Sequence, residues 1–217
     1  VSGELTQSRR YSVWDDGKPW MPEISGRGEV LLEKLLRNNI MVVNSPLFKR
    51  SVVQEVGEFA PDLTPVEDWD YLTRCALAGF QFDYEDGEGI RALVRAHELS
   101  ASLDGRRMMR ATLKMRRAWA TKTLTERHHR RVNEQLIAEC EGLLGVEEVM
   151  HGNRFQGALN ILKAATLDRN MRHRAKWLAC ALLAPFATGE QLRNAVTNSF
   201  TGSAASVLRR REANARR

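Results

Sequence analysis

The stretch P-V-E-D-W-D-Y-L-T-R-C-A-L-A-G-F (residues 65–80) decides how the first half of this 217-residue chain is interpreted. Its apolar side chains Trp69, Leu72, Cys75 and Ala76 recur at helical spacing. Gly79 follows directly, where a helix commonly ends. The spacing therefore predicts a helix that starts near residue 67 and ends before residue 79.

Three carboxylates, Glu67, Asp68 and Asp70, stand at the start of this predicted helix. Acidic side chains there complement the helix dipole and cap free N–H groups, so capping is their ordinary role. A carboxylate held in a site can instead take a proton during catalysis. The spacing alone favours capping, and the elements around this helix decide whether catalysis should be considered.

Predicted helices and strands alternate on either side of this helix. Helices are predicted at residues 29–39 and 47–57, and the second is closed by Gly57. Residues 40–46 (I-M-V-V-N-S-P) and 80–86 (F-Q-F-D-Y-E-D) are typical of strands, and Asp16-Gly17 predicts a turn within a hairpin over residues 1–24. Alternating helices and strands predict an α/β domain over residues 1–105.

The composition changes after residue 103, where Arg, Ala, Leu and Met dominate. Amphipathic helical patterns follow, and Phe155, Leu159, Leu162 and Ala165 share one helical face. The helices over residues 154–184 resemble a single tetratricopeptide-like hairpin. We therefore expect an all-α extension over residues 106–201, followed by a basic tail over residues 202–217.

Charge is divided unevenly between these two parts. Residues 1–105 contain 11 Lys/Arg and 18 Asp/Glu, whereas residues 106–217 contain 22 and 9. A basic second half is suited to a protein partner or an anionic membrane surface, although a solvated basic face is the ordinary explanation. Nucleic acid is not expected as a partner, because no recognised reading motif is present.

The three cysteines and the lengths of the apolar runs indicate in which cellular compartment the chain is expected. Cys75, Cys140 and Cys180 are far apart and lie in apolar patterns, so a disulfide framework or a zinc site is not expected. The longest apolar run is shorter than the roughly 20 residues that span a bilayer. These features predict a cytoplasmic protein, with peripheral attachment to the inner face of a membrane as a further option.

Several motifs, in order, resemble the acceptor-side half of a GT-A fold inverting glycosyltransferase of family two. The stretch E-D-W-D-Y-L-T-R-C-A-L-A-G is similar to that family's E-D-W-D helix, and R-A-H-E-L-S-A-S (residues 95–102) to its R-x-H-x-x-S-x-S stretch. The segment F-K-R-S-V-V-Q-E-V-G-E-F is similar to the segment that ends V-G-G-F-D in the family, although Glu58 and Ala60 depart from it. The resemblance implies a partial GT-A fold with a mixed sheet, flanked by helices.

The resemblance also implies a reaction and a site. The chain would take part in moving a sugar from a nucleotide-sugar donor to an acceptor hydroxyl with inversion, with Asp68 as the base. Glu67 and Trp69 would bind the acceptor, by hydrogen bonds and by stacking, although core packing is an equal alternative for Trp69. His97 and Asn44 would lie on the donor and metal side.

Two neighbours of these residues have simpler expected roles. Asp70 is expected to cap its helix, and Arg74 to pair with a nearby carboxylate. A divalent metal, Mg²⁺ or Mn²⁺, is expected for the full enzyme, but the motif that would hold it is missing from residues 1–217. The resemblance therefore implies that the donor-binding half precedes Val1.

A second hypothesis belongs to a different class. In it the first part is an inactive remnant, and the basic helical half is a binding module for a protein or an anionic surface. The missing metal motif, together with Glu58 and Ala60, favours this hypothesis, whereas the E-D-W-D stretch favours the enzyme.

Overall fold

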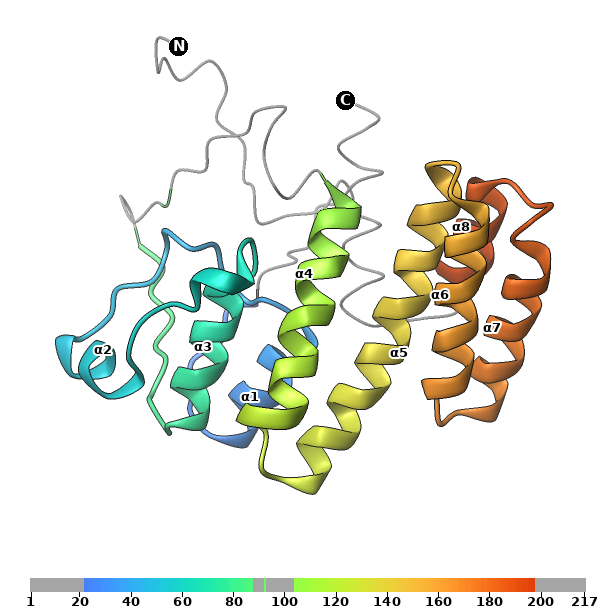
Figure 1. Ribbon diagram of the computed structural model, residues 1–217. Coiled ribbons are helices and arrows are strands. Elements are labelled where there is room, and N and C mark those ends of the chain that lie inside the picture. The colour runs from blue at the N-terminus through green and yellow to red at the C-terminus, as the bar shows by residue number, and fades with distance from the viewer. Residues whose placement is uncertain (1–21, 88–91, 93–103, 198–217) are drawn as a thin grey trace, which may run out of the picture.

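The computed structural model describes residues 22–87, 92 and 104–197, and the regular elements in these residues are helices (Figure 1). In chain order they are α1 (Glu29–Arg37), α2 (Arg50–Val56), the 3₁₀ turn η1 (Pro61–Leu63), α3 (Glu67–Leu77), α4 (Gly105–Ala118), the π-helical turn η3 (Trp119–Thr123), α5 (Arg127–Met150), α6 (Arg154–Leu167), α7 (Met171–Leu183) and α8 (Gly189–Thr197).

The predicted α/β domain is wrong for the residues that the structure describes. They contain no sheet, and their β pairing is one antiparallel bridge in which Gly26 and Phe82 exchange two backbone hydrogen bonds of 2.8 Å. A single bridge cannot form the central sheet of a GT-A domain, so the family resemblance is not supported. The predicted hairpin at residues 1–24 and most of residues 88–103 lie outside the described residues.

The strand predicted at residues 40–46 has a physical reason to fail. Only Ile40 is buried, and it packs at the end of α1, while Val43 is exposed. Ser45 donates from both its backbone N–H and its hydroxyl group to the carbonyl of Val42, which closes a turn. An apolar run without a neighbouring strand has no ladder partners, so local hydrogen bonds prevail.

The helices predicted in the first half are confirmed. On α1, Leu31, Leu32, Leu35 and Leu36 form one buried face, because residues four apart share a side of a helix. Gly57 ends α2 at a φ of 82°. Gly79 follows α3 at a φ of 83°, a conformation that costs glycine little.

Two large apolar cores and a smaller cluster of Val52, Tyr71 and Cys75 are present among the described residues, and α4 contributes to both large cores. The α1–α3 core combines those helices with Met115 and Trp119. The α5–α7 core includes Met109 and Leu113 from another side of α4. The domain boundary predicted between residues 105 and 106 stays a prediction, but α4 ties the two cores together (Figure 1).

Glycines on α5 and α6 let the α5–α7 core close. A side chain on Gly142 would collide with the Trp177 ring. A Cβ on Gly145 would lie 2.6 Å from the carbonyl oxygen of Gly157, on α6. The backbones of α5 and α6 therefore touch at Gly145 and Gly157, and no side chain separates them.

The apolar face that the spacing locates on α6 is mostly exposed. Phe155, Leu159 and Leu162 are exposed, and only Ala165 of that set is buried. The side that packs against α5 is built from smaller residues around the contact between Gly145 and Gly157. Close backbone approach selects this side, although the other carries the larger apolar side chains.

The three cysteines are unpaired and buried, as predicted. Burial raises the pKa of Cys75 to about 11 and that of Cys140 to about 11. Burial also raises the pKa of Cys180. Within the described residues, no helix combines the length and the apolar composition that crossing a membrane would require.

Candidate acid–base site at the start of α3

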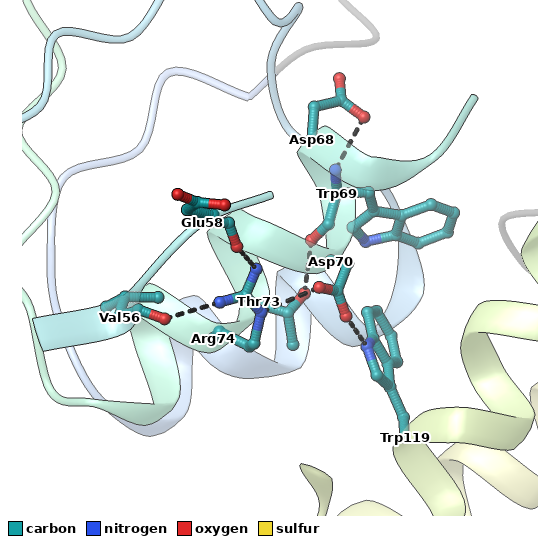
Figure 2. A network of polar contacts seen from close by, with 8 residues as sticks. All are labelled: Val56, Glu58, Asp68, Trp69, Asp70, Thr73, Arg74 and Trp119. Carbon is teal, nitrogen blue, oxygen red and sulfur yellow. Dashed lines mark hydrogen bonds and ion pairs between the residues drawn. The ribbon is translucent and has the colours of Figure 1, made fainter. Parts of the chain in front are cut away.

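The first turn of α3 holds Glu67 and Asp68, and the end of α1 reaches it through Asn39. The Asn39 side-chain amide donates to Asp68 Oδ2 at 3.0 Å. The backbone N–H of Trp69 donates to Asp68 Oδ1 at 2.7 Å. Asp68 is thus held by two donors, one from its own helix and one from 29 residues upstream. Figure 2 shows the hydrogen bond from Trp69.

Burial raises the pKa of the Asp68 carboxyl above its ordinary value. The two hydrogen bonds act in the opposite direction, and the neighbouring charge of Glu67 adds to the rise. Among the described residues no Lys or Arg forms an ion pair with Asp68. A carboxylate with a raised pKa and no neutralising cation is a good proton acceptor.

Glu67 contributes a second acceptor next to Asp68. Its Oε2 atom is buried and has no hydrogen-bond partner among the described residues. An unpaired buried acceptor is costly in a folded protein, so this atom calls for an explanation. A hydroxyl group that approached Asp68 could satisfy it only after the side chains that cover it moved.

Trp69 is a core side chain in this structure. It is 6% exposed, and its indole N–H donates to the carbonyl of Leu35 at 2.6 Å. The Arg116 guanidinium lies 5.0 Å from its ring centroid, and the Trp119 ring meets it edge-on at 6.0 Å. An acceptor sugar could stack on this ring only if these neighbours moved.

Asp70 has a larger role than the predicted cap. It is 4% exposed, and Oδ1 accepts from the indole N–H of Trp119 at 2.8 Å (Figure 2). Oδ2 accepts from Arg74 Nε at 2.9 Å, which confirms the predicted pairing of Arg74. Arg74 also donates to the carbonyls of Val56 and Glu58, so one carboxylate connects α2, α3 and η3.

Sequence reasoning missed Arg116, which lies beneath the site. Its guanidinium is fully buried, donates to the carbonyl of Leu36 at 2.9 Å and lies 5.0 Å and 5.8 Å from the rings of Trp69 and Trp119. Burial lowers its pKa. A lone Arg in a basic helix gives no sequence signal for this position, since its partners Leu36 and Trp69 are far away in the sequence.

Only one of the two residues predicted on the donor side is described by the structure. Asn44 lies in the exposed turn after α1 rather than at a strand end, so the placement predicted for it is wrong. His97 lies outside the described residues.

One group elsewhere has ligands that could hold a metal ion. Glu29 and Glu33 on α1 and His128 on α5 place ligand atoms within 4.8 Å of one another. All three side chains are exposed. The buried His129 beside them already contacts Glu29 through Nε2 at 2.8 Å, so this group carries no metal assignment.

The basic groove between α4, α5 and α6 is partly neutralised. Arg110 pairs with Glu148, and Arg117 pairs with Glu141, and both carboxylates are buried at the groove floor. Burial acts to raise the pKa of Glu148, but hydrogen bonds from Asn153 and Arg110 outweigh it and hold the pKa below its ordinary value. Arg110 and Arg117 therefore already have anionic partners.

Comparison with known proteins finds no match: no family model fits the chain, and no curated protein or solved structure is significantly similar to it. The resemblance to family-two glycosyltransferases thus has support neither from the fold nor from the comparisons.

Proposed function

We propose that Asp68 accepts a proton from a substrate hydroxyl group in a sugar-transfer reaction, with Glu67 binding a second hydroxyl of the same acceptor. The observation that carries the proposal is the pairing of a raised-pKa carboxylate with an unpaired buried carboxylate oxygen one residue away. This pair supports the proton-acceptor role of Asp68, and the sugar-transfer class is carried over from the sequence as a hypothesis.

The chemistry of the pair favours a polyhydroxylated acceptor. Asp68 and Glu67 bring two acceptors and no cation, so a phosphate group would be repelled from them. A sugar or another polyol offers neighbouring hydroxyl groups, one to lose its proton to Asp68 and one to donate to Glu67 Oε2. The site therefore suits the acceptor and not the nucleotide.

The proposed step is a single displacement at the anomeric carbon of the donor sugar. The acceptor oxygen forms a bond to the anomeric carbon as the bond from that carbon to the nucleotide phosphate breaks. The acceptor proton moves to Asp68, and the nucleoside diphosphate leaves. One displacement of this kind inverts the anomeric carbon, and a base positioned within hydrogen-bond reach is what it needs.

A divalent cation, Mg²⁺ or Mn²⁺, remains part of the proposal, since it would neutralise charge on the leaving diphosphate. Among the described residues we assign no ligands to it. The nucleotide-sugar donor is likewise proposed as a class, without a named sugar.

The test uses the natural protein that carries this sequence. Release of nucleoside diphosphate is measured with a panel of nucleotide sugars and polyol acceptors, in the presence of Mg²⁺ or Mn²⁺. We expect Asp68→Asn to lower kcat by about 10²–10⁴-fold, which is the usual contribution of a general base. Glu67→Gln should raise the KM for the acceptor more than it lowers kcat.

Asp83→Asn is the matched control, because Asp83 is an exposed carboxylate that accepts only from Gln81 among the described residues. It should leave turnover unchanged. Equal turnover of the wild type and Asp68→Asn would remove Asp68 as the base. Absence of turnover across the whole panel would count against the reaction class itself.

A further inference from the structure

The outer side of the α6–α7 hairpin exposes large apolar side chains. On α6 they are Phe155, Leu159 and Leu162, which are spaced i, i+4 and i+7 and so form one stripe. On α7 they are Met171, Leu178 and Leu182, which are spaced i, i+7 and i+11. Single exposed apolar residues are normal, but two stripes on neighbouring helices form a patch that calls for an explanation.

Both stripes lie opposite the buried sides of their helices. The inner side of α6 lies against α5, where Gly145 touches Gly157 and Ile161, while α7 packs mainly against α6 and reaches α5 through Trp177 at Gly142. Figure 1 shows α6 and α7 side by side, so their exposed sides lie on neighbouring helices. We call these six side chains, together with Phe186, the outer face.

The most exposed members of the outer face protrude. Phe186 is 84% exposed, Phe155 79%, Leu182 77% and Met171 71%. Arg154 donates to the carbonyls of Pro185 and Ala187, which fixes the start of α6 against the end of α7 and gathers Phe155 and Phe186 at one end of the hairpin. Protruding aromatic and aliphatic side chains suit insertion into a soft apolar layer.

The charges on these two helices have one sign. Neither α6 nor α7 contains an Asp or Glu, and together they carry five exposed cations: Arg154, Lys163, Arg172, Arg174 and Lys176. Asp168, in the turn between them, is buried and accepts from the Trp177 indole. An apolar face with only cations on its helices complements a uniformly anionic surface.

We propose that the outer face of the α6–α7 hairpin binds an anionic phospholipid bilayer, with Phe155, Leu182 and Phe186 entering the interface and the Lys and Arg side chains meeting lipid phosphates. Long cationic side chains can lie along apolar surface while their charged ends reach the headgroups. The hairpin lies on the bilayer and does not cross it. This inference is independent of the reaction proposed for Asp68.

The test is co-sedimentation of the full chain with vesicles of phosphatidylcholine alone and of phosphatidylcholine with about a third phosphatidylglycerol. We expect binding to the anionic vesicles that weakens as salt rises, because surface charges are screened. The double variant Phe155→Ser/Phe186→Ser should lower the partition coefficient at least about tenfold, since each Phe loses its apolar contact. Leu182→Ser is a second, independent variant.

Matched controls come from surfaces outside the hairpin. Leu47→Ser removes a fully exposed apolar side chain, and Lys34→Gln/Lys49→Gln removes two exposed cations. These variants should bind as the wild type does, while Arg174→Gln/Lys176→Gln should bind more weakly, because Arg174 lies beside Met171 of the outer face. Circular dichroism spectra should be the same for all variants, because every altered side chain is exposed.

Two results would overturn the proposal. One is vesicle binding that is absent, or that Phe155→Ser/Phe186→Ser and Leu182→Ser leave unchanged. The other is sedimentation velocity showing a dimer that Phe155→Ser/Phe186→Ser dissociates, without any vesicle binding. The outer face would then be a contact between two copies of the chain.

Discussion

At the scale of single residues, the three carboxylates at the start of α3 have separate roles because their surroundings differ. Asp70 is buried between two donors, Asp68 is held by an amide, and Glu67 keeps a free oxygen. The four-residue stretch E-D-W-D therefore contains a structural tie and a candidate proton acceptor. Sequence spacing treats the three as equivalent, since it cannot show which side chain faces another element.

Asp70→Ala should destabilise the protein by about 2–4 kcal/mol. The substitution leaves the indole N–H of Trp119 buried without an acceptor and releases Arg74, which is itself partly exposed. Asp62→Ala is the control, because the ion pair of Asp62 with Lys114 is exposed on both sides and should contribute under about 1 kcal/mol. Urea denaturation measures both, and equal losses would contradict the role assigned to Asp70.

Asp68→Asn should make the protein more stable at neutral pH, with Tm rising by about 1–3 °C. A folded-state pKa raised above the ordinary 3.8 means that the protonated form is favoured on folding. That contribution is complete below pH 3.8 and is lost as pH rises through the folded pKa, so the ionised carboxylate weakens the fold at pH 7. Asn removes this penalty.

The Tm difference between Asp68→Asn and wild type should therefore shrink as pH is lowered toward 4. Thermal melts at several pH values measure it, with Asp83→Asn as the exposed control. A difference that stays constant with pH would show that ionisation of Asp68 is not its origin. A gain in stability on losing a site residue is the usual pattern for functional groups.

At the scale of elements, helix periodicity was a reliable guide and apolar runs were not. The spacing predicts α1, α2 and α3 because apolar residues four apart must share a buried side. Residues 40–46 and 80–86 have strand-like composition, yet a strand needs a partner, and only Gly26 and Phe82 pair among the described residues. The wrong fold class follows from that missing partner.

A single sequence does not show which distant elements touch, and this explains both the exposed apolar face of α6 and the missed contact between Asp70 and Trp119. Periodicity located Phe155, Leu159 and Leu162 on one side but could not show that Gly145 and Gly157 pull the other side onto α5. Similarly, the pairing of Arg74 with Asp70 is local and was predictable, whereas Trp119 is 49 residues from Asp70. Contacts between distant elements leave no signature in a single sequence.

Gly145→Ala should destabilise the contact between α5 and α6 by about 1–3 kcal/mol, although Ala is the better helix former. Its Cβ would lie 2.6 Å from the Gly157 carbonyl oxygen and 2.9 Å from the Ile161 nitrogen, and backbone atoms cannot rotate away. Arg131→Ala, at an exposed position of the same helix, should be nearly neutral. Thermal denaturation compares the two, and a Gly145→Ala protein as stable as wild type would contradict the close approach.

At the scale of the whole molecule, α4 holds two differently built halves together. One side of α4 packs Met109 and Leu113 into the α5–α7 core, and another side packs Met115, with Trp119 directly after the helix, into the α1–α3 core. The candidate acid–base site belongs to one half, and the outer face proposed to meet lipid belongs to the other. Since both halves share one helix, the orientation of the hairpin on a surface would also set the orientation of Asp68.

The rate at which the buried cysteines react with an alkylating reagent reports how often the structure around each of them opens. Cys75 lies in α3, Cys140 in α5 and Cys180 in α7, so the half around α1 and α3 carries one thiol and the other half carries two. Only the thiolate reacts with an alkylating reagent, and the pKa of Cys75 and of Cys140 is about 11. In the native protein these thiols should stay unlabelled for long periods. The order in which they become alkylated on mild denaturation would then show which half opens first, and no further cysteine would have to be introduced.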